Sequence, residues 1–121
     1  MSDPRAAWVV THDGRVFNLR KFEMPVRIGR SDDADVVVKN DTVSRLHAFI
    51  EWHDDGHHVT DNETANGTRV DGIPLIAGQD APLTDGSEIM VGTMKLVYFL
   101  DGVNAARFAA DAANNPDLPD L

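Results

Sequence analysis

The sequence contains no cysteine, so this chain of 121 residues forms no disulfide and uses no thiolate as a nucleophile or metal ligand. It also has no apolar run approaching the roughly 20 residues that a membrane-spanning helix requires. Residues 1–5 lack the apolar core of a secretory signal, and a strand-like segment follows them. We therefore expect a cytoplasmic domain with no membrane partner.

Positive charge is scarce as well. The chain has 11 lysines and arginines against 20 aspartates and glutamates, and its formal net charge is −9. The average field therefore repels nucleic acids and anionic lipids, which argues against a nucleic-acid partner. An anion that binds must be captured locally, by a few cations and backbone N–H groups. The cations nearest the motifs described below are Arg30, Lys39, Arg45 and Arg69.

Short segments rich in β-branched and aromatic residues alternate with turn signals. The turns are dipeptides such as Asp13-Gly14 and Asp85-Gly86, which accept the positive φ that tight hairpins require. Nine segments between them predict strands: 7–11, 15–19, 26–29, 36–38, 46–52, 57–61, 68–70, 88–91 and 94–100. Together they predict one all-β sandwich or barrel over residues 7–101.

The C-terminal tail, residues 102–121, has a different composition. Residues 104–113 are rich in alanine and stop before an Asn-Asn-Pro sequence, which predicts one short helix. One face of this helix carries Val103, Ala106, Ala110 and Ala113. A helix this short is marginal on its own, so it either docks Phe108 on the sandwich or frays. Residues 117–121 are typical of a linker or disordered end.

Two polar motifs lie at the ends of predicted strands. Gly29 allows a sharp turn at the end of its strand, and Arg30 after it can direct a planar five-donor guanidinium into the loop space. Further on, Ser44-Arg45-Leu46-His47 lies where a loop becomes a strand. The serine hydroxyl and backbone N–H can both donate to a phosphate oxygen, while the arginine adds positive charge.

Residues 46–52 show the two-residue repeat of a strand with one buried face. The apolar positions are Leu46, Ala48, Ile50 and Trp52. This alternation places His47 on the opposite, polar face, together with Arg45, Glu51 and His53.

A third motif spans residues 61–72 around Asn66-Gly67, which is a strong hairpin signal. An exposed asparagine amide offers a donor and an acceptor together, which suits binding to the backbone of an extended peptide.

In this order and at these spacings, the motifs resemble those of the forkhead-associated (FHA) domain: Gly29-Arg30, then Ser44-x-x-His47, then Asn66-Gly67-Thr68-x-Val70-x-Gly72. The segment 85–92 is similar to that family's late strand. The resemblance covers residues 7–101 and implies an eleven-stranded β-sandwich whose loops bind phosphothreonine in extended peptides. It implies a non-enzymatic module of Ser/Thr-kinase signalling, without a cofactor, whose partners are phosphothreonine-containing proteins that such a kinase has modified.

The resemblance also implies a role for each motif residue. Arg30 and Ser44 would contact the phosphate, and Arg45 would line the same pocket. Asn66 would hydrogen-bond the peptide backbone beside the phosphothreonine. Structural support of the loops would come from Gly29, His47, Gly67 and Thr68.

Two further positions bear on affinity and specificity. Thr42 falls where family members often select the residue three places after the phosphothreonine. Ala65 stands where many members carry a hydroxyl, so we expect one contact to be missing, at a cost of about tenfold in affinity. Thr64 stands where serine is usual and keeps the loop's internal hydrogen bond.

Other site chemistries are disfavoured by the spacing. A hydrolase triad built on Ser44 and His47 would need the two side chains on one face, and residues three apart on a strand point to opposite faces. A Gly-x-Ser-x-Gly elbow is also absent. The segment 32–35 lacks the glycine and distal glutamate of a calcium loop. The only other metal candidate is the polar turn formed by His53, Asp54, Asp55, His57 and His58.

The remaining alternative is a sandwich that binds a partner without phosphate, through a sheet face or as a homodimer. The joint presence of Arg30, Ser44 and Asn66 argues against it, because a module that ignores phosphate has no need to keep all three.

Overall fold

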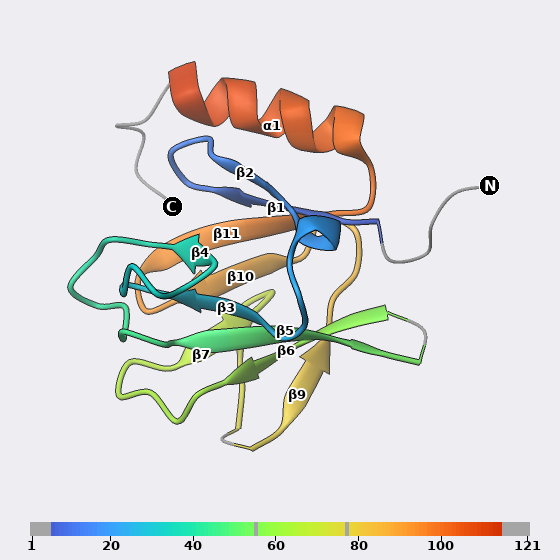
Figure 1. Ribbon diagram of the computed structural model, residues 1–121. Helices are drawn as coiled ribbons and strands as arrows, with labels where there is room; N and C mark the ends of the chain where they lie inside the picture. The colour runs from blue at the N-terminus through green and yellow to red at the C-terminus, as the bar shows by residue number, and fades with distance from the viewer. Residues whose placement is uncertain (1–5, 55, 77, 115–121) are drawn as a thin grey trace.

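The computed structural model describes residues 6–54, 56–76 and 78–114, and in them eleven strands form two sheets (Figure 1). The first sheet is antiparallel throughout. Its strands, in spatial order, are β2 (Val16–Asn18), β1 (Trp8–Thr11), β11 (Met94–Phe99), β10 (Glu88–Val91), β7 (Thr68–Val70) and β8 (Ile73–Pro74).

The second sheet carries the segments on which the first two polar motifs lie. Its strands, in spatial order, are β4 (Val36–Val37), β3 (Val26–Gly29), β5 (Ala48–His53), β6 (Gly56–Asp61) and β9 (Asp80–Pro82). Only the β3–β4 pair is parallel. A short 3₁₀ helix, η1 (Leu19–Lys21), links the first sheet to the second.

The hydrophobic core lies between the two sheets. Alternate residues of the strands point inward, and the largest fully buried apolar side chains include Ile28, Ile50, Ile89, Leu96 and Tyr98. Burial of each such side chain contributes about 1.5 to 3 kcal/mol to folding. The packed core therefore fixes the ends of the strands, and each loop between two strands begins and ends at a fixed position.

The predicted β-sandwich with a C-terminal helix is confirmed, but the helix packs through a different face. Helix α1 (Gly102–Asn114) lies on β1, β2 and β11. Its Ala105 and Ala109 are buried against Val10, and the Phe108 ring lies 5.5 Å from that of Phe99. The face predicted from alanine spacing is exposed, because the bulky Phe108 side chain determines which side docks.

The close contact of α1 with the β1–β2 turn explains why a glycine is found there. Gly14 has φ +89°, and a Cβ at this position would lie 2.6 Å from the carbonyl oxygen of Ala109. The predicted linker, residues 117–121, lies outside the described residues. Within the described part of the chain, no helix combines the length and apolar character needed to cross a membrane.

Two strands of the structure, β8 and β9, were not predicted from the sequence. β8 and β9 are two and three residues long, each ends in a proline, and each lies at the edge of its sheet. Such short edge strands lack the alternation on which sequence prediction depends. The predicted strand 46–52 also begins later, at Ala48, so that residues 46 and 47 belong to the preceding loop.

Candidate functional site

Three loops meet at one end of the sandwich: 30–35 after β3, 38–47 after β4 and 62–67 after β6 (Figure 1). Backbone hydrogen bonds join the first two directly. The N–H of Arg30 donates to the carbonyl of Ser44 at 2.9 Å, and that of Ser31 donates to the carbonyl of Arg45 at 3.1 Å. The first two sequence motifs are therefore one structural unit.

Gly29 makes this close approach possible. A Cβ on Gly29 would lie 2.1 Å from the carbonyl oxygen of Arg45, a distance that no side chain can tolerate. Gly29 is not among the glycines with positive φ. It therefore supports the site by letting two backbones touch, and not by the sharp turn that its position in the sequence suggested.

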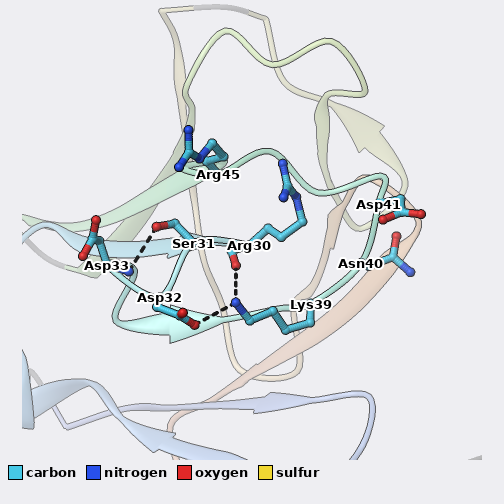
Figure 2. Close-up of a pocket in the computed structure, with 8 residues that line it drawn as sticks. All are labelled: Arg30, Ser31, Asp32, Asp33, Lys39, Asn40, Asp41 and Arg45. Atoms are coloured by element: carbon cyan, nitrogen blue, oxygen red, sulfur yellow. Dashed lines mark hydrogen bonds and ion pairs between the residues drawn. The ribbon is translucent and has the colours of Figure 1, made fainter.

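Arg30 and Arg45 present their guanidinium groups on the same side of the loops, as Figure 2 shows. The Nε of Arg30 donates to the carbonyl of Val43 at 3.0 Å, which fixes the side chain and leaves the two terminal nitrogens directed into the pocket. Arg45 is exposed. An arginine held in this way offers a planar set of donors that matches the oxygens of a phosphate or carboxylate.

These two arginines line a cavity of about 560 Å³. Its wall is formed by polar and charged residues, namely Arg30, Ser31, Asp32, Asp33, Lys39, Asn40, Asp41 and Arg45. The wall thus contains three cationic side chains and three carboxylates. Ser44 and Asn66 are not part of this wall, so the two predicted ligands lie beside the cavity and not in it.

Lys39, one of the three cations of the wall, is already paired with a carboxylate of the same wall. Its Nζ donates to the carbonyl of Arg30 at 3.0 Å and to Oδ1 of Asp32 at 2.7 Å (Figure 2). This hydrogen bond and the lysine charge hold the pKa of Asp32 below its usual value. Sequence reasoning noted Lys39 only as a nearby cation, since nothing in the sequence shows that its side chain reaches back to the Arg30 loop.

His47 lies beneath the loops and is completely buried. Its Nδ1 accepts a hydrogen bond from the backbone N–H of Ser44 at 2.9 Å. Its Nε2 lies 2.8 Å from the carbonyl of Gly67, and since a carbonyl only accepts, this nitrogen carries the proton. One imidazole therefore ties the Ser44 loop to the Gly67 loop.

Two sequence expectations are wrong at this point. His47 was placed on the polar face of a strand, but β5 begins only at Ala48, so the alternation does not extend to residue 47. The backbone N–H of Ser44 was expected to be available to a phosphate, but it is donated to His47. Only the Ser44 hydroxyl is left for a ligand.

Asp61 is a supporting residue that sequence reasoning missed. Its Oδ1 accepts hydrogen bonds from the hydroxyls of Thr64 at 2.6 Å and Thr68 at 2.7 Å, and its Oδ2 accepts from the backbone N–H of Thr64 at 3.0 Å. Burial alone raises the pKa of Asp61. The hydrogen bonds from Thr64 and Thr68 outweigh burial, and the pKa is lower than usual.

The Thr64 hydroxyl also accepts the backbone N–H of Gly67 at 3.0 Å, so this loop has the internal hydrogen bond that the sequence predicted. Asn66 and Ala65 are exposed at its outer surface. The amide Nδ2 of Asn66 donates to the carbonyl of Thr42 at 2.8 Å. The third motif is thereby joined to the second.

The hydrolase alternative rests on the Ser44–His47 pair, whose geometry does not support it. Ser44 bonds to His47 through its backbone N–H, and both ring nitrogens of His47 are occupied, so this pair offers no free base for a hydrolase. Among the described residues no group of three or more His, Asp or Glu side chains is placed to hold a metal. His57 is buried against the Tyr98 hydroxyl at 2.7 Å, and residue 55 lies outside the described part of the chain.

The two sheets form a β-sandwich, and hydrogen bonds join the three loops at one of its ends. Residues 26–92 match the family described as FHA domain, which is more than half of the chain. The chain belongs to the FHA domain family.

Curated relatives are longer proteins. The chain is 40% identical over 82 residues to the ABC transporter ATP-binding/permease protein Rv1747 of Mycobacterium tuberculosis, covering 68% of the chain and 9% of that protein. It is 37% identical over 78 residues to the oxoglutarate dehydrogenase inhibitor of Corynebacterium jeikeium, covering 64% of the chain and 51% of that protein. The chain therefore spans 9% of the first relative and about half of the second.

Solved structures agree in fold. One comes from work on phosphothreonine-dependent FHA domain interactions, with a TM-score of 0.70, 28% identity, and coverage of 79% of this chain and 97% of that one. Another is EmbR of Mycobacterium tuberculosis in complex with a low-affinity phosphopeptide, with a TM-score of 0.71, 26% identity, and coverage of 80% and 25%.

Proposed function

We propose that this domain binds phosphothreonine-containing segments of other proteins and thereby serves Ser/Thr-kinase signalling as a non-enzymatic, cytoplasmic module. The observation that carries the proposal is the Arg30 guanidinium, fixed by the Val43 carbonyl and directed into a polar cavity beside Arg45. In a chain of net charge −9, two arginines held together at loop ends form a local anion site.

Each proposed contact has a distinct place. Arg30 and Arg45 face the cavity and would hold the phosphate, with the Ser44 hydroxyl at its edge. Asn66, fixed on the neighbouring loop, would bind the peptide backbone. The solved FHA structures with phosphothreonine-dependent interactions or a bound phosphopeptide support phosphothreonine as the ligand class, since they share the fold at more than 25% identity.

The strength of these contacts is sufficient for binding. A hydrogen bond to a charged group contributes about 1.5 to 3 kcal/mol, and micromolar affinity requires about 8 kcal/mol. Arg30, Arg45 and Ser44 would supply such bonds to the phosphate, Asn66 would add neutral bonds to the backbone, and the total is of this order. The carboxylates of Asp32, Asp33 and Asp41 in the same wall oppose an anion, so we expect an affinity in the micromolar range.

The direct test is a titration with a degenerate peptide mixture centred on phosphothreonine, and with its unphosphorylated twin, followed by fluorescence polarisation. We expect saturable binding of the phosphorylated mixture and none of the twin. Equal curves for both would instead support a sandwich that recognises its partner without phosphate, and would overturn the proposal.

A further inference from the structure

Two loops of the site, 38–47 and 62–67, meet the β10–β11 turn at one residue, Thr42. Its carbonyl accepts the hydrogen bond from the Asn66 amide at 2.8 Å. Its hydroxyl accepts the backbone N–H of Thr93, in the β10–β11 turn, at 3.0 Å and donates to Oδ1 of Asn40 at 2.6 Å. Thr42 therefore links its own loop to the Asn66 loop and to a turn 51 positions away in sequence.

The bond to the Thr42 carbonyl fixes the orientation of the Asn66 side chain. A carbonyl oxygen only accepts, so the amide group that faces it is NH₂, and Oδ1 points the other way. Within the described residues Asn66 Oδ1 accepts no hydrogen bond. The exposed side of the amide thus presents one free acceptor and one remaining N–H, which are the two groups that pair with the backbone of an extended peptide.

Close packing holds Thr42 in place from the opposite side. Gly92 has φ +58°, and a Cβ there would lie 2.4 Å from the Thr42 carbonyl oxygen and 2.5 Å from its hydroxyl. The backbone of the β10–β11 turn therefore lies directly against Thr42. The carbonyl that orients Asn66 has little freedom to move.

We propose that Thr42 is the positioning residue that sets the Asn66 amide for the peptide backbone. This inference rests on the proposed function and assigns Thr42 a task other than selection of a peptide side chain. Its hydroxyl is committed to Asn40 and Thr93, so it is not available to read the residue three places after the phosphothreonine.

Binding measurements test the inference with closely matched variants. Thr42→Val removes the hydroxyl and keeps the shape of the side chain. We expect it to weaken binding of the phosphothreonine peptide mixture about tenfold, which corresponds to the loss of one hydrogen bond between Asn66 and the peptide backbone. Thr42→Ser restores the hydroxyl and should bind within about twofold of the parent. Thr60→Val, on β6, is the matched control and should leave affinity unchanged.

A double-mutant cycle distinguishes positioning from a separate contact. If Thr42 acts through Asn66, Thr42→Val combined with Asn66→Ala binds no more weakly than Asn66→Ala alone. The same change combined with Ser44→Ala should instead add its full cost. An additive result with Asn66→Ala would overturn the inference.

A measurement without ligand separates this inference from the proposed function. The side-chain amide signals of Asn66 in a ¹⁵N NMR spectrum should move toward those of a free asparagine in Thr42→Val and stay in place in Thr42→Ser. If this occurs in a protein that binds no phosphopeptide, positioning stands and the proposed function fails. If Thr42→Val leaves these signals unmoved, the positioning role is refuted whatever the parent protein binds.

Discussion

The site has two layers that differ in burial and in what they support. The lower layer consists of His47, Thr68 and Asp61, which are 0%, 1% and 7% exposed. The upper layer consists of Arg30 and Arg45, which are exposed. The loops and the strand ends beside them thus carry both residues that hold the backbone and residues that are exposed to a ligand.

The comparison shows that the cost of a substitution depends on the layer. A buried polar group left without its partner costs about 1 to 3 kcal/mol of folding free energy, whereas a change at an exposed side chain usually costs less than about 0.5 kcal/mol. Substitutions in the lower layer should therefore lower stability and binding together. Substitutions in the upper layer should lower binding alone.

The largest effect is expected from His47→Ala in the lower layer. The change leaves the Ser44 N–H and the Gly67 carbonyl unpaired and opens a cavity, so the free energy of unfolding should fall by about 3 to 5 kcal/mol. Urea denaturation measures the loss. His53→Ala, at the exposed end of β5, is the control and should change stability by less than about 0.5 kcal/mol. Equal losses in both variants would remove the distinction between the layers.

Arg30→Ala should have the largest effect in the upper layer. Loss of two charge-assisted hydrogen bonds costs about 3 kcal/mol or more, so affinity for the phosphothreonine mixture should fall about 100-fold. The free energy of unfolding should change by about 1 kcal/mol or less, since within the described residues the Arg30 side chain gives up one hydrogen bond, that to the Val43 carbonyl.

Two companions of Arg30→Ala make the result specific. Arg30→Lys keeps the charge and loses the planar donor set, so it should recover only part of the affinity. Arg107→Ala, on the exposed side of α1, removes the same charge away from the loops and should bind like the parent. Binding that persists in Arg30→Ala would show that the anion site lies elsewhere.

Asp61 predicts how stability depends on pH. Its pKa in the folded protein is below the usual value, so its stabilising contribution is complete above about pH 4 and is lost as the pH falls from there through the lower folded pKa. Asp61→Asn should reduce the free energy of unfolding at neutral pH by about 1 to 3 kcal/mol and flatten this acid dependence. Urea titrations at neutral pH and at about pH 3 measure both quantities. Asp33→Asn, an exposed control, should leave the acid slope intact, and an unchanged slope in Asp61→Asn would refute the assignment.

The smallest expected effect is a gain of affinity at Ala65. This residue is exposed on the Asn66 loop, and Ala65→Thr or Ala65→Ser supplies the hydroxyl that many family members carry there. One additional hydrogen bond should tighten binding about five- to tenfold. Ala65→Val has the shape of the threonine variant without the hydroxyl and should give no gain. A gain with valine, or none with threonine, would show that position 65 does not reach the phosphate.

Much of the fold follows from local sequence signals. Strands such as 26–29, 68–70 and 88–91 match the structure because β-branched residues and Asx-Gly turns define them locally. The edge strands β8 and β9 do not, since pairing with a neighbouring strand and not their own composition makes them extended. The docking face of α1 was also set by a distant contact, that between Phe108 and Phe99.

The sequence indicated which residues come together at the site. It did not indicate most of the hydrogen bonds that these residues make. Arg30, Ser44 and Asn66 lie in loops that meet, as their motif spacing indicated. The resemblance implied that His47 supports the loops. The individual hydrogen bonds, from the Ser44 N–H to His47 and from two threonines to Asp61, depend on the folded shape of the loops and could not be predicted from the sequence. The ion pair between Lys39 and Asp32 likewise forms only when the two loops are folded, so the sequence does not reveal it.

The most direct test of the account is an NMR titration of the ¹⁵N-labelled domain with the phosphothreonine mixture and with its unphosphorylated twin. The account predicts that the phosphorylated mixture shifts the signals of Arg30, Ser44, Arg45 and Asn66, while the twin shifts none of them. Shifts confined to the edge strands β8 and β9 or to α1, or equal shifts with both mixtures, would contradict it.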